Sequence, residues 1–342
     1  MKKSLVAAVV SAAVMLPIGA QADDGLTVYG SIRNAIDFND PADPAADSTT
    51  DISTIGSRLG FKGSADLGNG LTARGHFEFG LNTDKKANDL SNRLASVGVA
   101  GGFGSIDIGN QWSAFYKTTG VDMDPTYSLG GVPGSPYRAS NTIKYVNSVG
   151  PLTVHADLRL NGGGDEAGTD GLAGDGGGLG VRVAVAEGLT LAAAYDTEDR
   201  SDNMMHEYVS AKDATATKPA RKGQGPETDR VGVSGKLELG QFWGTLAWSS
   251  KNVNDYDAKT EKETEYTQLF IGASLTDNTS GYVGYGQSET EGSMLEPSVV
   301  NVGLSHSLGG GMSLFYEGRS EDTDETNKDS IIRHYVALRF DF

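Results

Sequence analysis

Four arginines stand where apolar and polar residues alternate along the chain. Arg58 alternates with Leu59 and Phe61, and Arg93 alternates with Leu94. Successive strand residues point to opposite faces, so a strand that turns its apolar residues outward turns these guanidinium groups inward. The same parity gives a set of four inward cations: Arg33, Arg58, Arg93 and Arg138. Arginine stays charged at physiological pH and is weakly hydrated, so this set suits the electrostatic handling of ions better than bond-making chemistry.

Two acidic residues, Asp122 and Asp124, lie in a polar stretch between two alternating segments. Carboxylates that face arginines across a narrow space would set up a field that sorts ions by charge. Two plainer interpretations stay open. The arginines could simply line a solvated interior or pair with lipid headgroups, and the aspartates could serve the solubility of a loop.

Patterns for catalysis and metal binding are weak. The chain has no Gly-x-Ser-x-Gly elbow for a nucleophilic serine, and its five histidines lack the helical spacing of metal ligands. Glycine–aspartate runs at 161–165 and 174–178 superficially resemble calcium-binding repeats but show no nonapeptide period. We therefore predict no catalytic residue, no cofactor and no assigned metal site. A diffuse layer of divalent ions between acidic loops and lipid phosphates stays open.

The elements that would position the arginines are strands with period-two alternation. In the last of them, 331–342, apolar residues at even positions alternate with polar or small ones up to the final Phe342. A soluble β-sandwich could give such a pattern in any one segment. We expect about sixteen segments, each near the length that a tilted membrane strand needs. They are 26–37, 57–67, 71–81, 93–101, 105–115, 138–147, 152–160, 180–186, 189–197, 229–239, 242–250, 264–275, 280–288, 298–308, 312–320 and 331–342.

Connections between these segments alternate between short and long. Short ones such as Gly68-Asn69-Gly70 suit tight hairpins, which need residues with positive φ. Long ones, rich in acidic and small polar residues, are 38–56, 82–92, 116–137, 161–179, 198–228, 251–263, 289–297 and 321–330. Strict alternation of this kind is typical of an all-β, antiparallel transmembrane barrel with both chain ends on the short-turn side. Aromatic residues near strand ends fit interfacial girdles: Trp243, Trp248, Tyr282, Tyr316, Phe340 and Phe342.

The N-terminal residues predict export. Lys2 and Lys3 precede an apolar run over 5–18, and Ala20-Gln21-Ala22 has the small-residue pattern of a cleavage site. We expect residues 1–22 to be a cleaved Sec signal peptide, in preference to a retained anchor, and 23–342 to form one barrel domain. Cleavage takes the formal charge from −17 to −19, because it removes Lys2 and Lys3. This acidic balance argues against nucleic acid as a partner.

Several runs resemble the general diffusion porins of Gram-negative outer membranes. Leu26-Thr27-Val28-Tyr29-Gly30 is similar to the opening strand of that family, and Arg58-Leu59-Gly60-Phe61-Lys62-Gly63 is similar to its second strand. The runs at 93–99 and 103–111 resemble the fourth and fifth strands, and 138–145 resembles the strand after the third loop. The resemblance covers essentially all of 23–342 and is best in 26–160 and 331–342, although the long loops after residue 160 carry no recognisable family motif.

The resemblance implies a barrel of about sixteen strands, a homotrimer, and a third long loop folded into the lumen. That loop would bring Asp122 and Asp124 to a constriction opposite the four arginines. The usual Pro-Glu-Phe-Gly-Gly of the family is replaced by Pro125-Thr126-Tyr127-Ser128-Leu129-Gly130-Gly131, so the second acidic group would be Asp124 or would be missing. Phe340 and Phe342 resemble the signal that the outer-membrane assembly machinery reads.

The function that this resemblance implies is passive diffusion of ions and small hydrophilic solutes through a water-filled pore in the outer membrane. Lipid and lipopolysaccharide would surround the barrel. A substrate-specific porin would call for a lysine-rich or aromatic track, and the sequence shows neither. A non-conducting barrel, acting as an adhesin, receptor or hydrolase, is the alternative from another class. Acidic loops such as 321–325 favour a mild cation preference, whereas arginines at the constriction act in the other direction.

Overall fold

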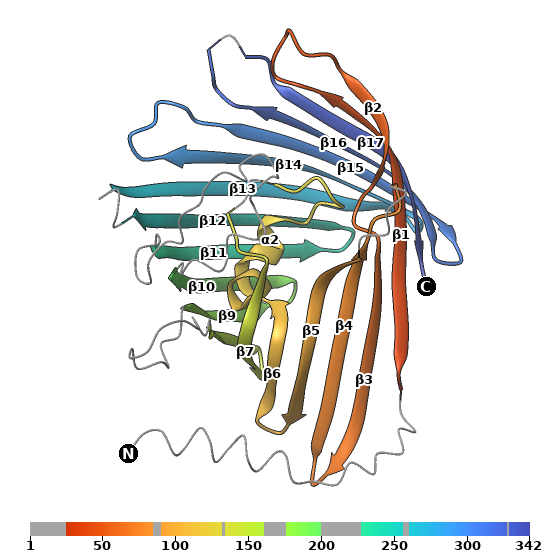
Figure 1. The fold of residues 1–342 in the computed structure, drawn as a ribbon, viewed down its shortest axis with the longest axis vertical. Helices are drawn as coiled ribbons and strands as arrows, with labels where there is room; N and C mark the ends of the chain where they lie inside the picture. Colours follow the sequence, from red (N-terminus) through yellow and green to blue (C-terminus); the bar gives the residue numbers. More distant parts are fainter. Residues whose placement is uncertain are drawn as a thin grey trace, which may run out of the picture.

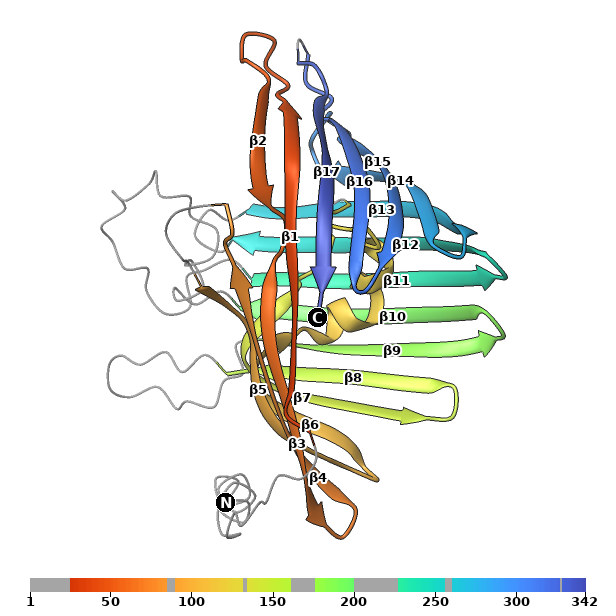
Figure 2. The same cartoon turned by 90° about the vertical axis from the view of Figure 1, so that its right-hand side faces the viewer.

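The computed structural model describes residues 25–84, 90–131, 134–160, 176–199, 227–255, 260–326 and 328–342. Strands of this part of the chain form one antiparallel sheet that closes on itself (Figures 1 and 2). They are β1 Thr27–Asp40, β2 Thr49–Thr54, β3 Arg58–Gly68, β4 Leu71–Leu81, β5 Leu90–Gly101, β6 Gly104–Trp112, β7 Arg138–Val149, β8 Leu152–Arg159, β9 Gly176–Ala186, β10 Leu189–Asp199, β11 Glu227–Leu239, β12 Phe242–Asp255, β13 Thr260–Thr276, β14 Thr279–Thr290, β15 Ser298–Gly309, β16 Met312–Asp322 and β17 Ile331–Asp341.

Two short helical turns, η1 (Tyr116–Gly120) and α2 (Val121–Met123), follow β6. Both fall within the stretch that the sequence predicts as a long loop, and Figure 2 shows them on the inner side of the curved sheet. No helix of the described residues is long and apolar enough to cross a membrane.

The second position in the barrel is shared by two strands, which makes a sixteen-stranded barrel from seventeen described segments. Strand β1 pairs with β3 over Thr27–Ser31 and with β2 over Asn34–Asn39. The two strands β2 and β3 are separated by a bend at Gly56, whose φ is +86°. There, the Ser57 hydroxyl accepts a hydrogen bond from Arg33 N at 2.8 Å and donates one to Arg33 O at 3.1 Å. The predicted loop at 38–56 therefore contains a strand that its sequence did not indicate.

Strand β17 closes the barrel against β1, as the sequence predicts. The register runs from Ser31 opposite Asp341 to Asp40 opposite Ile332. Beyond it, Gly30 N donates to Phe342 O at 2.9 Å and Phe342 N donates to Gly30 O at 3.1 Å. Because Gly30 has no Cβ, the Phe342 ring can lie directly over it. The predicted signal peptide, and the glycine–aspartate run at 161–165, lie outside the described residues.

The two faces of the sheet have opposite polarity. On β17, Tyr335 and Ala337 are 0% and 1% exposed, whereas Val336 and Leu338 are 44% and 51% exposed. The same alternation runs along β1, where exposed isoleucines flank the buried Arg33. A sheet that turns aliphatic side chains outward and polar side chains inward suits a lipid surround and an aqueous interior.

Aromatic rings on the inner face lie over glycines of the neighbouring strand. Tyr29 faces Gly60 across β1 and β3, and Tyr282 faces Gly303 across β14 and β15; in each pair a Cβ on the glycine would collide with the ring. Such cross-strand pairs help to fix register. The expectation that Tyr282 belongs to an interfacial girdle is wrong, because this side chain is buried inside the barrel.

Candidate functional site

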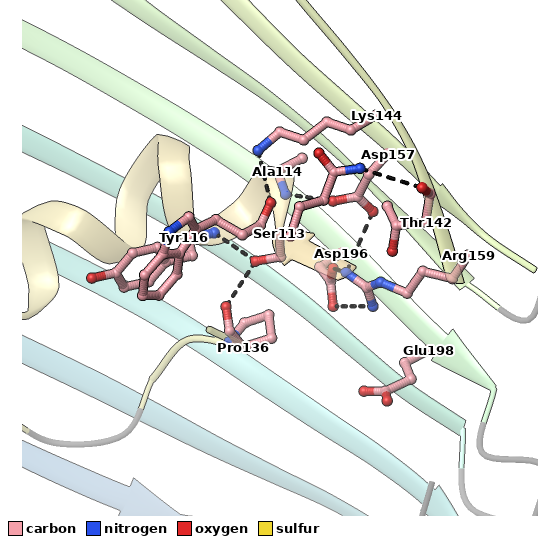
Figure 3. Close-up of polar contacts among 12 residues, drawn as sticks. Ser113, Ala114, Tyr116, Pro136, Thr142, Lys144, Asp157, Arg159, Asp196 and Glu198 are labelled. Atoms are coloured by element: carbon pink, nitrogen blue, oxygen red, sulfur yellow. Dashed lines mark hydrogen bonds and ion pairs between the residues drawn. The ribbon is translucent and has the colours of Figure 1, made fainter. Parts of the chain in front are cut away.

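A buried ion network lies where the chain leaves β6 for the interior (Figure 3). Asp157 of β8 accepts a hydrogen bond from the Ala114 backbone N–H, and Arg159 pairs with Asp196 of β10. Arg230 of β11 also reaches Asp196, at 2.8 Å. The Arg159 and Asp196 side chains are almost fully buried. Since an unpaired charge there would be costly, the network holds this part of the wall, and with it the first residue of the segment, in one arrangement.

The internal segment, residues 113–137, is tied together at its base. Ser113 Oγ donates to Pro136 O at 2.8 Å and accepts from Tyr116 N at 3.0 Å. The buried Thr118 then packs against the wall over Gly180 of β9, where a Cβ would collide with it. Small residues on the wall thus admit the helical turns η1 and α2.

Asp122 is buried against the wall. Its carboxylate accepts hydrogen bonds from Arg182 of β9, at 2.8 Å from Nη1 and 3.2 Å from Nη2, and from Ser234 of β11 at 2.6 Å. From the sequence we expected Asp122 to face the arginines at a constriction. In the structure the charge of Asp122 is balanced by Arg182 of β9, a residue that the sequence did not single out.

The tip of the segment is held by Glu317 of β16. The backbone N–H groups of residues 127, 128 and 129 donate to its carboxylate at 2.6, 2.9 and 2.8 Å. The Tyr282 and Tyr335 hydroxyls donate to the same group. Arg319, two residues on, donates to Leu129 O at 2.9 Å. Glu317 is fully buried, and five donors satisfy its charge.

Glu317 and Arg319 were not predicted from the sequence. The available signal was weak: the two residues share parity with Phe315 on a strand that was predicted correctly, so all three face inward. Nothing in the local pattern connects them with residues 127–129, because the contact spans 188 to 190 residues of chain.

Three of the four predicted arginines gather on one part of the wall. Arg33 interacts electrostatically with Arg58 and Arg93, and also with Arg339 of β17, which was not predicted from the sequence. Arg33 Nε donates to Ser31 Oγ at 2.8 Å. Arg339 pairs with Asp341 at 2.7 Å. Among the described residues, Arg33 and Arg58 form no ion pair within 4.0 Å, so this arginine cluster keeps a net positive charge.

Arg93 reaches the inner face by a route that differs from the predicted one. The β4–β5 register shifts between Glu78 and Phe79, so that Glu78 lies opposite Leu94 and Phe79 opposite Asn92. This bulge turns Leu94 inward, where it is buried, although simple alternation placed it outside. Arg93 is the extra residue, and its Nε donates to Glu78 at 2.7 Å.

The fourth arginine and Asp124 both act on Tyr116. Arg138 stacks over the Trp112 ring at 5.4 Å, and Trp112 stacks on Tyr116 with 4.7 Å between centroids. Burial and the charge of Asp124 raise the pKa of the Tyr116 phenol, against the opposing influence of Arg138, Arg93 and Arg58. The Tyr116 phenol is therefore influenced both by the negative charge of Asp124 and by the positive charges of the arginines.

Asp124 is held on the internal segment by hydroxyl groups. Its carboxylate accepts from Thr126 Oγ1 at 2.5 Å and from the Tyr137 hydroxyl at 3.1 Å, and the structure shows no ion pair to it in the part of the chain it describes. Within the described ranges, no group of three or more His, Cys, Asp or Glu side chains is arranged to hold a metal ion.

Comparison with known proteins gives two kinds of likeness. A family model described as Gram-negative porin matches residues 6–326. The major outer membrane protein P.IB of Neisseria gonorrhoeae is 35% identical over 130 residues, which cover 36% of each chain. That of Neisseria lactamica is 33% identical over 130 residues, covering 36% of this chain and 37% of the relative. The chain thus spans about a third of the length of the curated relatives it matches.

Solved structures share the architecture over almost the whole chain. The loop L8 deletion mutant of OmpT from Vibrio cholerae superposes with a TM-score of 0.72 at 18% identity, covering 93% of this chain and 99% of that one. The anion-selective porin from Comamonas acidovorans superposes with a TM-score of 0.71 at 17% identity, covering 93% of this chain and 99% of that one. Salmonella typhi OmpF in complex with daunomycin superposes with a TM-score of 0.71 at 19% identity, covering 94% of this chain and 99% of that one. At such identities the likeness concerns the fold alone.

Proposed function

The chain belongs to the Gram-negative porin family of outer-membrane barrels, and from this premise we propose that it is a general diffusion porin. Its barrel would enclose a water-filled channel through which ions and small hydrophilic solutes pass passively. The observation that carries the proposal is the internal segment, which contacts β9 and β11 through Asp122 and β16 through Glu317. A segment anchored to well-separated strands of a closed barrel would narrow the lumen without filling it.

The charges along this passage support a role for the arginine cluster and Asp124 in ion selectivity. Among the described residues, Arg33 and Arg58 form no ion pair on one side, and the Asp124 carboxylate is hydrogen-bonded to hydroxyl groups on the internal segment. We assign Asp122 to anchoring, because Arg182 already balances it. The narrow part of the channel would then favour anions, in opposition to the acidic outer loops, whose influence fades as salt shortens the Debye length to about 8 Å at physiological ionic strength.

The partners that we propose follow from the family and the barrel surface. A homotrimer is supported by the family and by the likeness to a solved trimer form of OmpT from Vibrio cholerae. The exposed aliphatic belt would contact outer-membrane lipid and lipopolysaccharide. Phe340 and Phe342, at the closing strand, would be read by the assembly machinery.

Planar-bilayer recording tests the proposal. The purified protein should give stepwise, ohmic conductance in KCl that small neutral sugars reduce only through their effect on viscosity. Complete block of the KCl conductance by one class of solute, rather than transient interruptions, would indicate a substrate-specific porin instead. The absence of steps from protein that retains its folded barrel would contradict channel function and favour the non-conducting alternatives.

A further inference from the structure

A cavity of about 320 Å³ lies between the inner wall of β3–β7 and the base of the internal segment. Among its lining residues are Lys62, Arg74, Lys117, Lys144, Trp112 and Asp107. It is distinct from the arginine cluster, because Lys62 lies four residues beyond Arg58 along β3, about 13 Å at the rise of a strand. The volume is within the range of pockets that hold small molecules, roughly 300–1,000 Å³.

The charge of this cavity is strongly positive. Arg74 and Asp107 neutralise each other through a hydrogen-bonded ion pair, with 2.6 Å between Arg74 Nε and Asp107 Oδ1. Among the described residues, Lys62, Lys117 and Lys144 form no ion pair with a carboxylate. Three ammonium groups thus line one cavity whose single lining carboxylate already has a partner.

Two of the lysines are held in place. The Lys144 ammonium donates to Trp112 O at 2.7 Å (Figure 3). Lys144 itself is only 6% exposed. Asp157 and Asp107 act on it electrostatically from beyond ion-pair distance. The Lys62 ammonium lies 4.6 Å from the centre of the Tyr29 ring. A buried charge without a close counter-ion is unfavourable, so an anion entering the cavity would relieve that cost and the mutual repulsion of the lysines.

We propose that this cavity is a binding subsite for small solutes that carry two or more phosphate or carboxylate groups. The inference deepens the proposed channel function, on which it rests for its role in transport. Spaced ammonium groups match the several oxyanions of such a solute, and charge-assisted hydrogen bonds are the strong ones. The lysines come from β3, the internal segment and β7. This separation along the chain explains why the sequence shows no lysine-rich track.

The test uses the full-length protein, with tripolyphosphate and citrate as probes. Calorimetric titration of the detergent-solubilised protein should detect binding, and the same probes should block single-channel current transiently. The double variant K62Q/K117Q leaves the buried Lys144 in place. It should raise the dissociation constant and the half-blocking concentration by about tenfold or more, as expected when charge-assisted contacts are lost. The matched control K262Q/K328Q also removes two positive charges, both at exposed positions outside the cavity, and should leave both values unchanged.

The outcomes separate the two proposals. No conductance steps in KCl would contradict channel function, and calorimetry would still decide the subsite. Failure of both probes to bind, or equal losses in K62Q/K117Q and in the control, would overturn the subsite even if the channel conducts. Binding of both probes that K62Q/K117Q weakens supports general oxyanion recognition. Binding of tripolyphosphate alone points to phosphate-bearing solutes, and binding of citrate alone to polycarboxylates.

Discussion

Glu317 joins the internal segment to a wall of the barrel through one carboxylate. Three consecutive backbone N–H groups and two tyrosine hydroxyls converge on it. A carboxylate is suited to this position because it has only acceptors, about four lone-pair sites on two oxygens. An amide of the same shape has one oxygen and would turn an NH2 group toward donors.

Glu317→Gln should therefore loosen the tip of the internal segment. At least one of the three N–H groups would lose its acceptor, at a cost of about 1–3 kcal/mol for each buried group left unsatisfied. We expect noisier single-channel current and a higher mean conductance. Glu265→Gln, at an exposed position on β13, is the matched control. Quiet current of wild-type amplitude from Glu317→Gln would show that the anchor does not hold the constriction.

Asp122 and Asp124 show how far single residues could be predicted. Both were expected at the constriction from a resemblance of the loop motif. The structure separates them, because α2 ends at Met123 and Asp124 lies past that turn with φ −136°. Asp122 turns to Arg182 and Asp124 to Tyr137. The sequence carries the acidic pair, but which of the two is neutralised depends on a long-range contact with β9.

At the scale of elements, alternation and turn chemistry were enough to predict sixteen of the seventeen described strands in their order, with β2 missed. The predicted closure of the first strand on the last is confirmed. Deviations occur where alternation fails locally, at the bulge beside Glu78 and at the break before Ser57. Single-residue shifts of this kind depend on the side chains of the facing strand, and the alternation within one strand carries no information about them. Predicted strands were also shorter than the observed ones: β13 begins at Thr260, four residues before the predicted start.

Aromatic–glycine pairs give an element-scale prediction. Gly303→Ala would push the Tyr282 ring, and with it a donor to Glu317, whereas Gly272→Ala would push only Trp243. Both variants should lower the temperature at which the detergent-solubilised barrel unfolds, since overpacking costs about 1–3 kcal/mol. Only Gly303→Ala should also increase current noise. Equal noise in the two variants would refute the link between strand packing and the anchor.

Closure is a property of the whole molecule, and Phe342 contributes to it at the junction. Its backbone makes two hydrogen bonds with Gly30, and its ring lies over that glycine. About half of the side chain remains exposed on the outer face. The residue therefore completes the sheet while part of its ring stays exposed on the outer face.

Phe342→Ala should lower the amount of protein in the outer membrane, because it removes the exposed ring of the proposed assembly signal while deleting little barrel surface. Phe242→Ala is the control, since Phe242 is exposed to a similar extent at the start of β12. The measurement is quantitative blotting of outer-membrane fractions. Equal levels of the two variants would remove the special role of Phe342.

Ion selectivity belongs to the whole molecule because two fields of opposite sign act on it. Acidic residues of the loop after β16, such as Asp324 and Glu325, would attract cations to the mouth, and the arginine cluster would attract anions farther in. Salt weakens the first field more, since the loops lie in water and the cluster is partly buried. The preference of the wild type should therefore shift toward anions as the salt concentration rises.

The most direct test is the zero-current potential across a bilayer in a KCl gradient, with the concentrated side near 1 M, where the Debye length is about 3 Å. Each of two single substitutions removes one charge from the proposed constriction. Arg58→Gln should move the potential toward cation preference, and Asp124→Asn should move it toward anion preference. If both variants conduct as the wild type does and neither shifts the potential, the assignment of these charges to the constriction is contradicted.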